Sequence, residues 1–126
     1  MDWKLEVVVL PATDVDRSKR FYNEQLGFNV DVDSQISDDF RIVQLTPPGS
    51  GCSVTVGTGL QRSLQLVVAD IEAAHVELVG RGVEVSKVQH MEDGVWVDGR
   101  GGPWNSFFFF TDPDGNDWAV QEKPAE

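Results

Sequence analysis

The chain has 126 residues, enough for one domain with a buried core, and 40% of them are hydrophobic, which is typical of a folded protein rather than a disordered one. Its net charge of −11 disfavours nucleic acid or an anionic membrane as a partner. A single cysteine, Cys52, excludes an internal disulfide and suits a reducing compartment. Because no stretch resembles a membrane span or a secretory signal, we expect one domain, residues 1–126, in the cytoplasm.

The first half of the chain predicts a strand, a helix and three more strands. Residues 5–12 are apolar enough for a buried strand. Asp14 then offers a helix N-cap, and Gly27 stands where a C-cap glycine belongs, so we expect a helix over about residues 14–25. The three later strands are expected at residues 28–33, 40–46 and 52–57.

The second half repeats this order. Residues 63–69 predict a strand, Asp70 is a second N-cap, and Gly82 corresponds to Gly27. Residues 83–85 correspond to the strand that follows the first helix. The sequence therefore predicts an α+β fold of two βαβββ units, over residues 5–57 and 63–122, with an insertion at about residues 88–105 in the second. We expect the two units to form facing curved sheets around a common cleft.

The clearest hairpin lies near the C-terminus. Four consecutive phenylalanines, residues 107–110, are too short for a globular helix and fit a pleated strand. The turn sequence that follows, Asp-Pro-Asp-Gly-Asn at residues 112–116, is rich in residues that favour turns, and an extended pattern resumes at Trp118.

Taken together, three features resemble the vicinal oxygen chelate superfamily, which contains glyoxalase I, bleomycin-resistance proteins and extradiol dioxygenases. They are the paired βαβββ units, the run from Thr13 to Phe28, and the turn at residues 112–116. This resemblance covers the whole chain and implies the glyoxalase/bleomycin resistance fold and its cleft. It does not fix a reaction, because the superfamily includes both metal enzymes and metal-free binders.

The resemblance also implies where a metal would be held. In metal-dependent members, the ligands are His, Gln or Glu on the first and last strand of each unit. Counting from the helix-capping aspartates and the turn glycines, the equivalent positions here are Val7, Ser53, Ser63 and Ala119. None of these side chains is a usable ligand for Zn²⁺ or a hard cation. We therefore expect no metal and no other cofactor.

Neither histidine replaces the missing ligands. His75 is expected on the outer surface of the second helix. His90 lies in the insertion beside acidic residues, where it could bind metal or act as an acid or base, or simply be a solvated loop histidine. We expect no catalytic residue set.

Strand alternation extends the predicted cleft wall beyond these four positions. Gln65 and Gln121 would bond either a ligand or each other and the backbone. Trp96 and Trp104 would stack on a flat ligand, or else pack on the sheet or a subunit interface. The predicted ligand-binding residues are Val7, Val9, Ser53, Thr55, Ser63, Gln65, Trp96, Trp104, Phe108, Ala119 and Gln121.

Three functions remain open at this point. The first is a metal-free protein that sequesters a flat aromatic or cationic compound, as antibiotic-resistance members do. The second is a glyoxalase- or dioxygenase-like enzyme, a lyase, isomerase or dioxygenase, with an atypical or absent metal site. The third is an accessory subunit with a vestigial cleft. Because superfamily members commonly pair and strand edges need cover, we also expect a homodimer.

Overall fold

A computed structural model describes residues 2–125 of the chain. The chain folds as two compact units. The N-terminal unit comprises residues 6–64, and the C-terminal unit comprises residues 65–125 together with residues 2–5.

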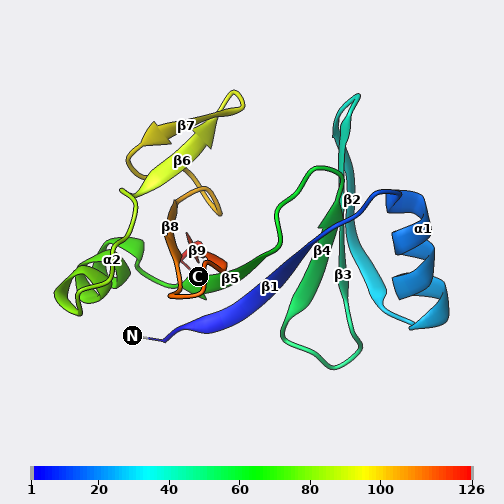
Figure 1. Ribbon diagram of the computed structural model, residues 1–126, viewed down its shortest axis with the longest axis horizontal. Helices are drawn as coiled ribbons and strands as arrows, with labels where there is room; N and C mark the ends of the chain where they lie inside the picture. The colour runs from blue at the N-terminus through cyan, green and yellow to red at the C-terminus, as the bar shows by residue number, and fades with distance from the viewer. Residues whose placement is uncertain (1, 126) are drawn as a thin grey trace. The chain divides into compact units, whose positions relative to one another are not determined.

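The N-terminal unit follows the predicted order of one helix and four strands (Figure 1). Its strands lie in the order β2-β3-β4-β1, with β1 and β4 parallel and the other neighbours antiparallel. The helical segment is α-helical at first and ends in a π-helix, η1. The elements are β1 (Lys4–Pro11), α1 (Val15–Arg20), η1 (Phe21–Gln25), β2 (Asn29–Ser37), β3 (Phe40–Thr46) and β4 (Ser53–Gly57).

One face of this sheet packs against α1 and η1. Asp14 caps α1 as predicted, because its carboxylate accepts a hydrogen bond from the Arg17 backbone N–H at 3.1 Å. The apolar core between helix and sheet consists of Val15, Val43, Leu45 and Val56. The opposite face of the sheet is therefore free of the helix.

The C-terminal unit repeats the plan with one addition. Its strands lie in the order β5-β9-β8-β6-β7. Read from β6 to β5, four of these strands repeat the order of β2-β3-β4-β1, and β7 is added at the edge beside β6. Figure 1 shows the β6–β7 hairpin projecting beyond β8. The elements are β5 (Ser63–Val68), α2 (Ile71–Gly80), β6 (Gln89–Glu92), β7 (Val95–Asp98), β8 (Phe107–Thr111) and β9 (Asp117–Glu122).

One sequence expectation for this unit is wrong. Residues 83–85 do not form a strand, and the strand that follows α2 is β6, which begins at Gln89. The segment over residues 88–105 contains the β6–β7 hairpin, which turns at Asp93 and Gly94 with positive φ values of 51° and 80°. Asp-Gly is the residue pair that two-residue hairpins favour.

Helix α2 covers one face of this second sheet. Asp70 caps α2 by accepting from the Ala73 backbone N–H at 3.0 Å, as predicted. The core between α2 and the strands consists of Val68, Ile71, Ala74, Phe108 and Val120.

Candidate functional site

The register of the β8–β9 hairpin decides which phenylalanines leave the core. Phe107 pairs with Gln121 and Phe109 pairs with Ala119. Residues directly opposite each other on antiparallel strands share a face of the sheet. Phe107 and Phe109 therefore lie on the face away from α2, with the two predicted site residues of β9.

Phe108 faces the other way, which corrects its assignment to the ligand wall. Its side chain is fully buried in the α2 core, and its ring meets the ring of His75 edge to face at 5.2 Å. A side chain enclosed in this way contacts no ligand. The prediction that His75 lies on the outer surface of α2 is also wrong. Its Nε2 lies 2.9 Å from the Ser86 carbonyl oxygen, and the residue is half-buried.

Trp96 completes an aromatic wall on the open face. Its indole meets Phe107 at 5.4 Å and Phe109 at 5.1 Å, edge to face in both cases, while the two phenylalanine rings are parallel at 6.2 Å. These are favourable geometries for aromatic pairs. Because 41% of Trp96 is still exposed, the wall keeps a free aromatic surface. We call Trp96, Phe107 and Phe109 the aromatic wall.

A chain of amide hydrogen bonds lies on the same face. Gln65 Nε2 donates to Gln121 Oε1 at 2.6 Å, and Gln121 Nε2 donates to the Trp104 carbonyl oxygen at 2.8 Å. The two glutamines thus bond each other and the backbone, one of the two alternatives left open by the sequence. Within residues 2–125, no group donates to Gln65 Oε1, so this oxygen can still accept a hydrogen bond.

Trp104 is not part of the aromatic wall. It has a φ of 60°, which a residue with a side chain rarely adopts, and 49% of it is exposed. It lines a separate shallow pocket of about 310 Å³ together with Arg100 and Lys123. Glu122 forms an ion pair with Arg100 at 2.6 Å at the same pocket, and this contact raises the pKa of Arg100.

The β6–β7 hairpin brings polar and flexible side chains to the aromatic wall that the sequence did not single out. Gln89 pairs with both Phe107 and Asp98, and Met91 pairs with Trp96. The side chains of Gln89, Met91 and Asp98 therefore lie on the open face. The Asp98 carboxylate accepts from Gln89 Nε2 at 3.3 Å and lies 3.6 Å from Lys87 Nζ. An exposed carboxylate two residues from Trp96 is a group that attracts cations.

In the N-terminal unit, the predicted site residues share the face away from α1. Parallel pairing places Val7 beside Ser53 and Val9 beside Thr55. The Ser53 hydroxyl lies 2.6 Å from the Thr46 hydroxyl, which also donates to Asp31. Ser63 begins β5. The positions that the resemblance equates with metal ligands on β1 and β4 are therefore true neighbours.

These positions do not fit a metal ion. Val7 and Ala119 carry no donor atom and are buried, and the Ser53 hydroxyl is engaged by Thr46. Divalent cations in proteins need imidazole, thiolate or carboxylate ligands. Elsewhere in residues 2–125, no group of three or more His, Cys, Asp and Glu side chains is placed to hold a metal.

Two other reactive side chains are His90 and Cys52. His90 lies on β6, where Nδ1 is 2.8 Å from the Gly99 carbonyl oxygen and Nε2 is 3.0 Å from Glu92. These contacts raise the pKa of His90. Because His90 pairs with Val97, it points to the face of the hairpin opposite Trp96. Burial, followed by the nearby charge of Glu6, raises the pKa of Cys52, which disfavours its reactive thiolate.

The chain belongs to the Glyoxalase/Bleomycin resistance protein/Dioxygenase superfamily, whose family model matches residues 4–120. The predicted α+β fold of βαβββ units is confirmed by this match and by solved structures of the superfamily. No curated protein matches the chain. Within residues 2–125, no helix is long and apolar enough to cross a membrane.

Three solved structures illustrate the likeness. Methylmalonyl-CoA epimerase from Mycobacterium tuberculosis has a TM-score of 0.73 at 19% identity, over 96% of this chain and 88% of that one. A methylmalonyl-CoA epimerase variant from Streptomyces coelicolor, in complex with 2-nitronate-propionyl-CoA, gives 0.68 at 16%, over 97% and 98%. A superfamily member from Vibrio splendidus gives 0.66 at 18%, over 97% and 100%. Identities this low show a shared fold alone, and membership of the superfamily rests on the family model.

Proposed function

We propose that this chain is a metal-free small-molecule-binding protein that takes a flat aromatic compound, preferably a cationic one, on the aromatic wall of its C-terminal unit. The observation that carries the proposal is the wall itself: Trp96, Phe107 and Phe109 are in mutual contact on the sheet face that α2 does not cover. Large aromatic side chains outside a core, held in fixed geometry, offer a planar ligand a preorganised surface.

Polar groups at the edge of the wall supply orientation. The free acceptor at Gln65 Oε1 can take a ligand N–H, since the amide is held by its bond to Gln121. On the hairpin side, Asp98 lies on the same strand face as Trp96, and its carboxylate is exposed. An aromatic ring and a carboxylate next to each other favour a planar cation over a neutral or anionic compound. The chain's net charge of −11 acts in the same direction.

The chemistry of the four family positions supports binding without metal chemistry. Valine, serine, serine and alanine leave small or apolar side chains where metal-dependent relatives place ligands. Sequestration needs no group beyond the aromatic wall and the polar side chains at its edge. An antibiotic-resistance role and a cytoplasmic location belong to this proposal. The single half-buried Cys52 supports a reducing compartment.

The test combines a thermal-shift assay with titration of tryptophan fluorescence. The probe is N-methylquinolinium, a planar cation, and quinoline at pH 8 serves as its neutral counterpart. The cation should raise the melting temperature with concentration, as mass action requires. Trp96→Leu should weaken its binding about two- to twelvefold, the value of one aromatic pair.

Two further variants separate the contributions. Asp98→Asn should weaken binding of the cation and leave quinoline unaffected. Val95→Ala, on the opposite face of the same strand, should change neither and serves as the matched control. Unchanged affinity in Trp96→Leu would refute the wall as the site. Consumption of the compound, followed by mass spectrometry, would instead place the chain among the superfamily's enzymes.

A further inference from the structure

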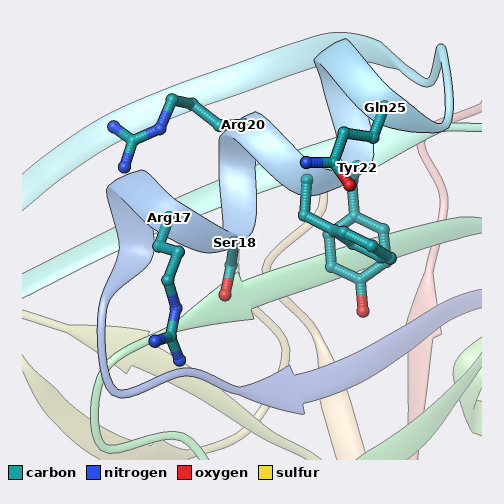
Figure 2. Close-up of a pocket in the computed structure, with 6 residues that line it drawn as sticks. Arg17, Ser18, Arg20, Tyr22 and Gln25 are labelled. Atoms are coloured by element: carbon teal, nitrogen blue, oxygen red, sulfur yellow. The ribbon is translucent and has the colours of Figure 1, made fainter.

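A second hollow lies along the helical segment in the N-terminal unit (Figure 2). Arg17, Phe21 and Gln25 follow each other at four-residue spacing and form one ridge, and Ser18 and Tyr22 form the next. Serine is the shortest of these side chains, so the groove between the ridges deepens beside it. The hollow measures about 340 Å³, within the roughly 300–1,000 Å³ of small-molecule pockets. We call it the helix groove.

The π-helix shapes this groove. The Leu26 N–H donates to the Phe21 carbonyl oxygen at 3.1 Å, five residues back, so the turn is wider than an α-turn. Tyr22 packs inward, with its ring stacked on Phe28 at 5.7 Å. Phe21 stays on the surface with 45% of its area exposed, although its ring also meets Tyr22 edge to face. Single π-turns of this kind are frequent at functional sites.

Each polar side chain of the helix groove can donate a hydrogen bond. Figure 2 shows Arg17, Ser18 and Tyr22 pointing to the same side of the helix, with Gln25 beside Tyr22 and Arg20 extending to the other side. In the described chain, no hydrogen bond or ion pair engages the Arg17 guanidinium or the Tyr22 hydroxyl. No acidic side chain lines the groove.

The helix groove is basic, whereas the chain as a whole is acidic. The chain has ten lysines and arginines against 21 acidic residues. Within residues 2–125, five of these cations form ion pairs, namely Lys19, Arg41, Arg81, Lys87 and Arg100. Arg17 and Arg20 do not, and both line the groove. Two guanidinium groups without an ion pair thus line one hollow of an acidic protein, Arg17 on the side of Ser18 and Tyr22 and Arg20 on the other side of the helix.

We propose that the helix groove is a binding site for a small aromatic anion, a ring that carries a carboxylate, sulfonate or phosphate group. The acidic group would lie at the Arg17 guanidinium and the hydroxyls of Ser18 and Tyr22, where charge-assisted hydrogen bonds form. The ring would lie on Phe21. This site is independent of the aromatic wall, because it belongs to the other unit and prefers the opposite ligand charge.

The experiment is an NMR titration of the ¹⁵N-labelled chain with 1-naphthoate, with 1-naphthylmethanol as its neutral analogue and inorganic phosphate as the anion alone. Naphthoate should shift the backbone amides of residues 17–26 in a saturable way. Phosphate should shift the same amides more weakly, and the neutral analogue should bind least. Saturable shifts confined to the strands β7 and β8, or no saturation at millimolar concentration, would overturn the proposal.

Three variants locate the contacts. Arg17→Gln should weaken naphthoate binding about three- to tenfold, the range for a partly exposed charged hydrogen bond. Ser18→Gln introduces a better helix former that fills the groove, and it should abolish binding without changing the charge. Arg62→Gln removes the same charge from an exposed residue elsewhere in this unit and should leave binding unchanged. Equal weakening by Arg17→Gln and Arg62→Gln would show general charge attraction and refute a built site, as would normal binding by Ser18→Gln.

Discussion

Neighbouring residues of the Phe107–Phe110 run should respond to truncation in opposite ways. Phe108 is fully buried against Ile71 and Ala74, so Phe108→Ala removes a complete core side chain and leaves a cavity. Changes of this kind cost about 3–5 kcal/mol of the free energy of unfolding. The lost edge-to-face contact with His75 belongs to the same loss. Against a typical total of about 5–15 kcal/mol, this is severe.

Phe109→Ala should cost much less. Phe109 is half-buried on the open face, where its main partners are Trp96 and Phe107. Losing these two aromatic pairs costs about 1–3 kcal/mol, at roughly 0.5–1.5 kcal/mol for each. The effects on ligand binding should be the reverse. Phe109→Ala should weaken binding of the planar cation, whereas the folded fraction of Phe108→Ala should bind it normally.

Urea unfolding followed by circular dichroism measures both costs, provided that the slope with denaturant stays constant. If Phe108→Ala does not fold, Phe108→Leu replaces it, since the smaller change should leave a folded but destabilised protein. Phe109→Ala as destabilising as Phe108→Ala would refute the assignment of the two faces. A loss of less than about 1 kcal/mol in Phe108→Ala would also refute it, because truncation of a buried aromatic ring costs more than that.

Three other predictions concern metal, assembly and pH. Elemental analysis of the purified protein should find no stoichiometric Zn, Ni, Fe or Mn, and one bound equivalent would contradict the reading of the family positions, which are Val7, Ser53, Ser63 and Ala119. Light scattering at micromolar concentration should give the mass of a homodimer, because the terminal strands β2 and β7 leave edges that need cover; a monomer mass would refute this. The pKa of His90 should lie above 6.5 by NMR and fall in Glu92→Gln, because the Gly99 carbonyl and then Glu92 stabilise the imidazolium. Since the folded-state pKa is the raised one, this stabilisation is complete below pH 6.5 and disappears as the pH rises through the folded-state pKa.

Features governed by short-range physics could be predicted from the sequence. Both helix caps, Asp14 and Asp70, accept the expected backbone hydrogen bonds. The turn at residues 112–116 forms as expected, with the Asp112 carboxylate accepting from the backbone N–H groups of Asp114 and Asn116 and with Gly115 at a φ of 84°. Capping and turn formation depend on a few neighbouring residues, so the local sequence is sufficient.

Hydrophobicity alone could not predict which phenylalanines of residues 107–110 face the core. Four identical residues give no alternation, so composition cannot say which pair faces the core. The turn length could have shown which phenylalanines share a face with Ala119, because a five-residue connection centred on Asp114 places Phe109 opposite Ala119. The β6–β7 hairpin also had a visible signal, the Asp93-Gly94 pair between alternating residues. The π-helix had none that we can identify.

Comparison of the two repeats shows what the fold itself requires of the open face. Both units have the same strand order, and their fourth strands place Ser53 and Ala119 at corresponding positions. Ala119 pairs with Phe109, whereas the hydroxyl of Ser53 bonds that of Thr46 on the third strand. A βαβββ unit therefore folds with Thr46 at the position that corresponds to Phe109. Since the topology does not require rings there, the aromatic wall needs another explanation, and ligand binding supplies one.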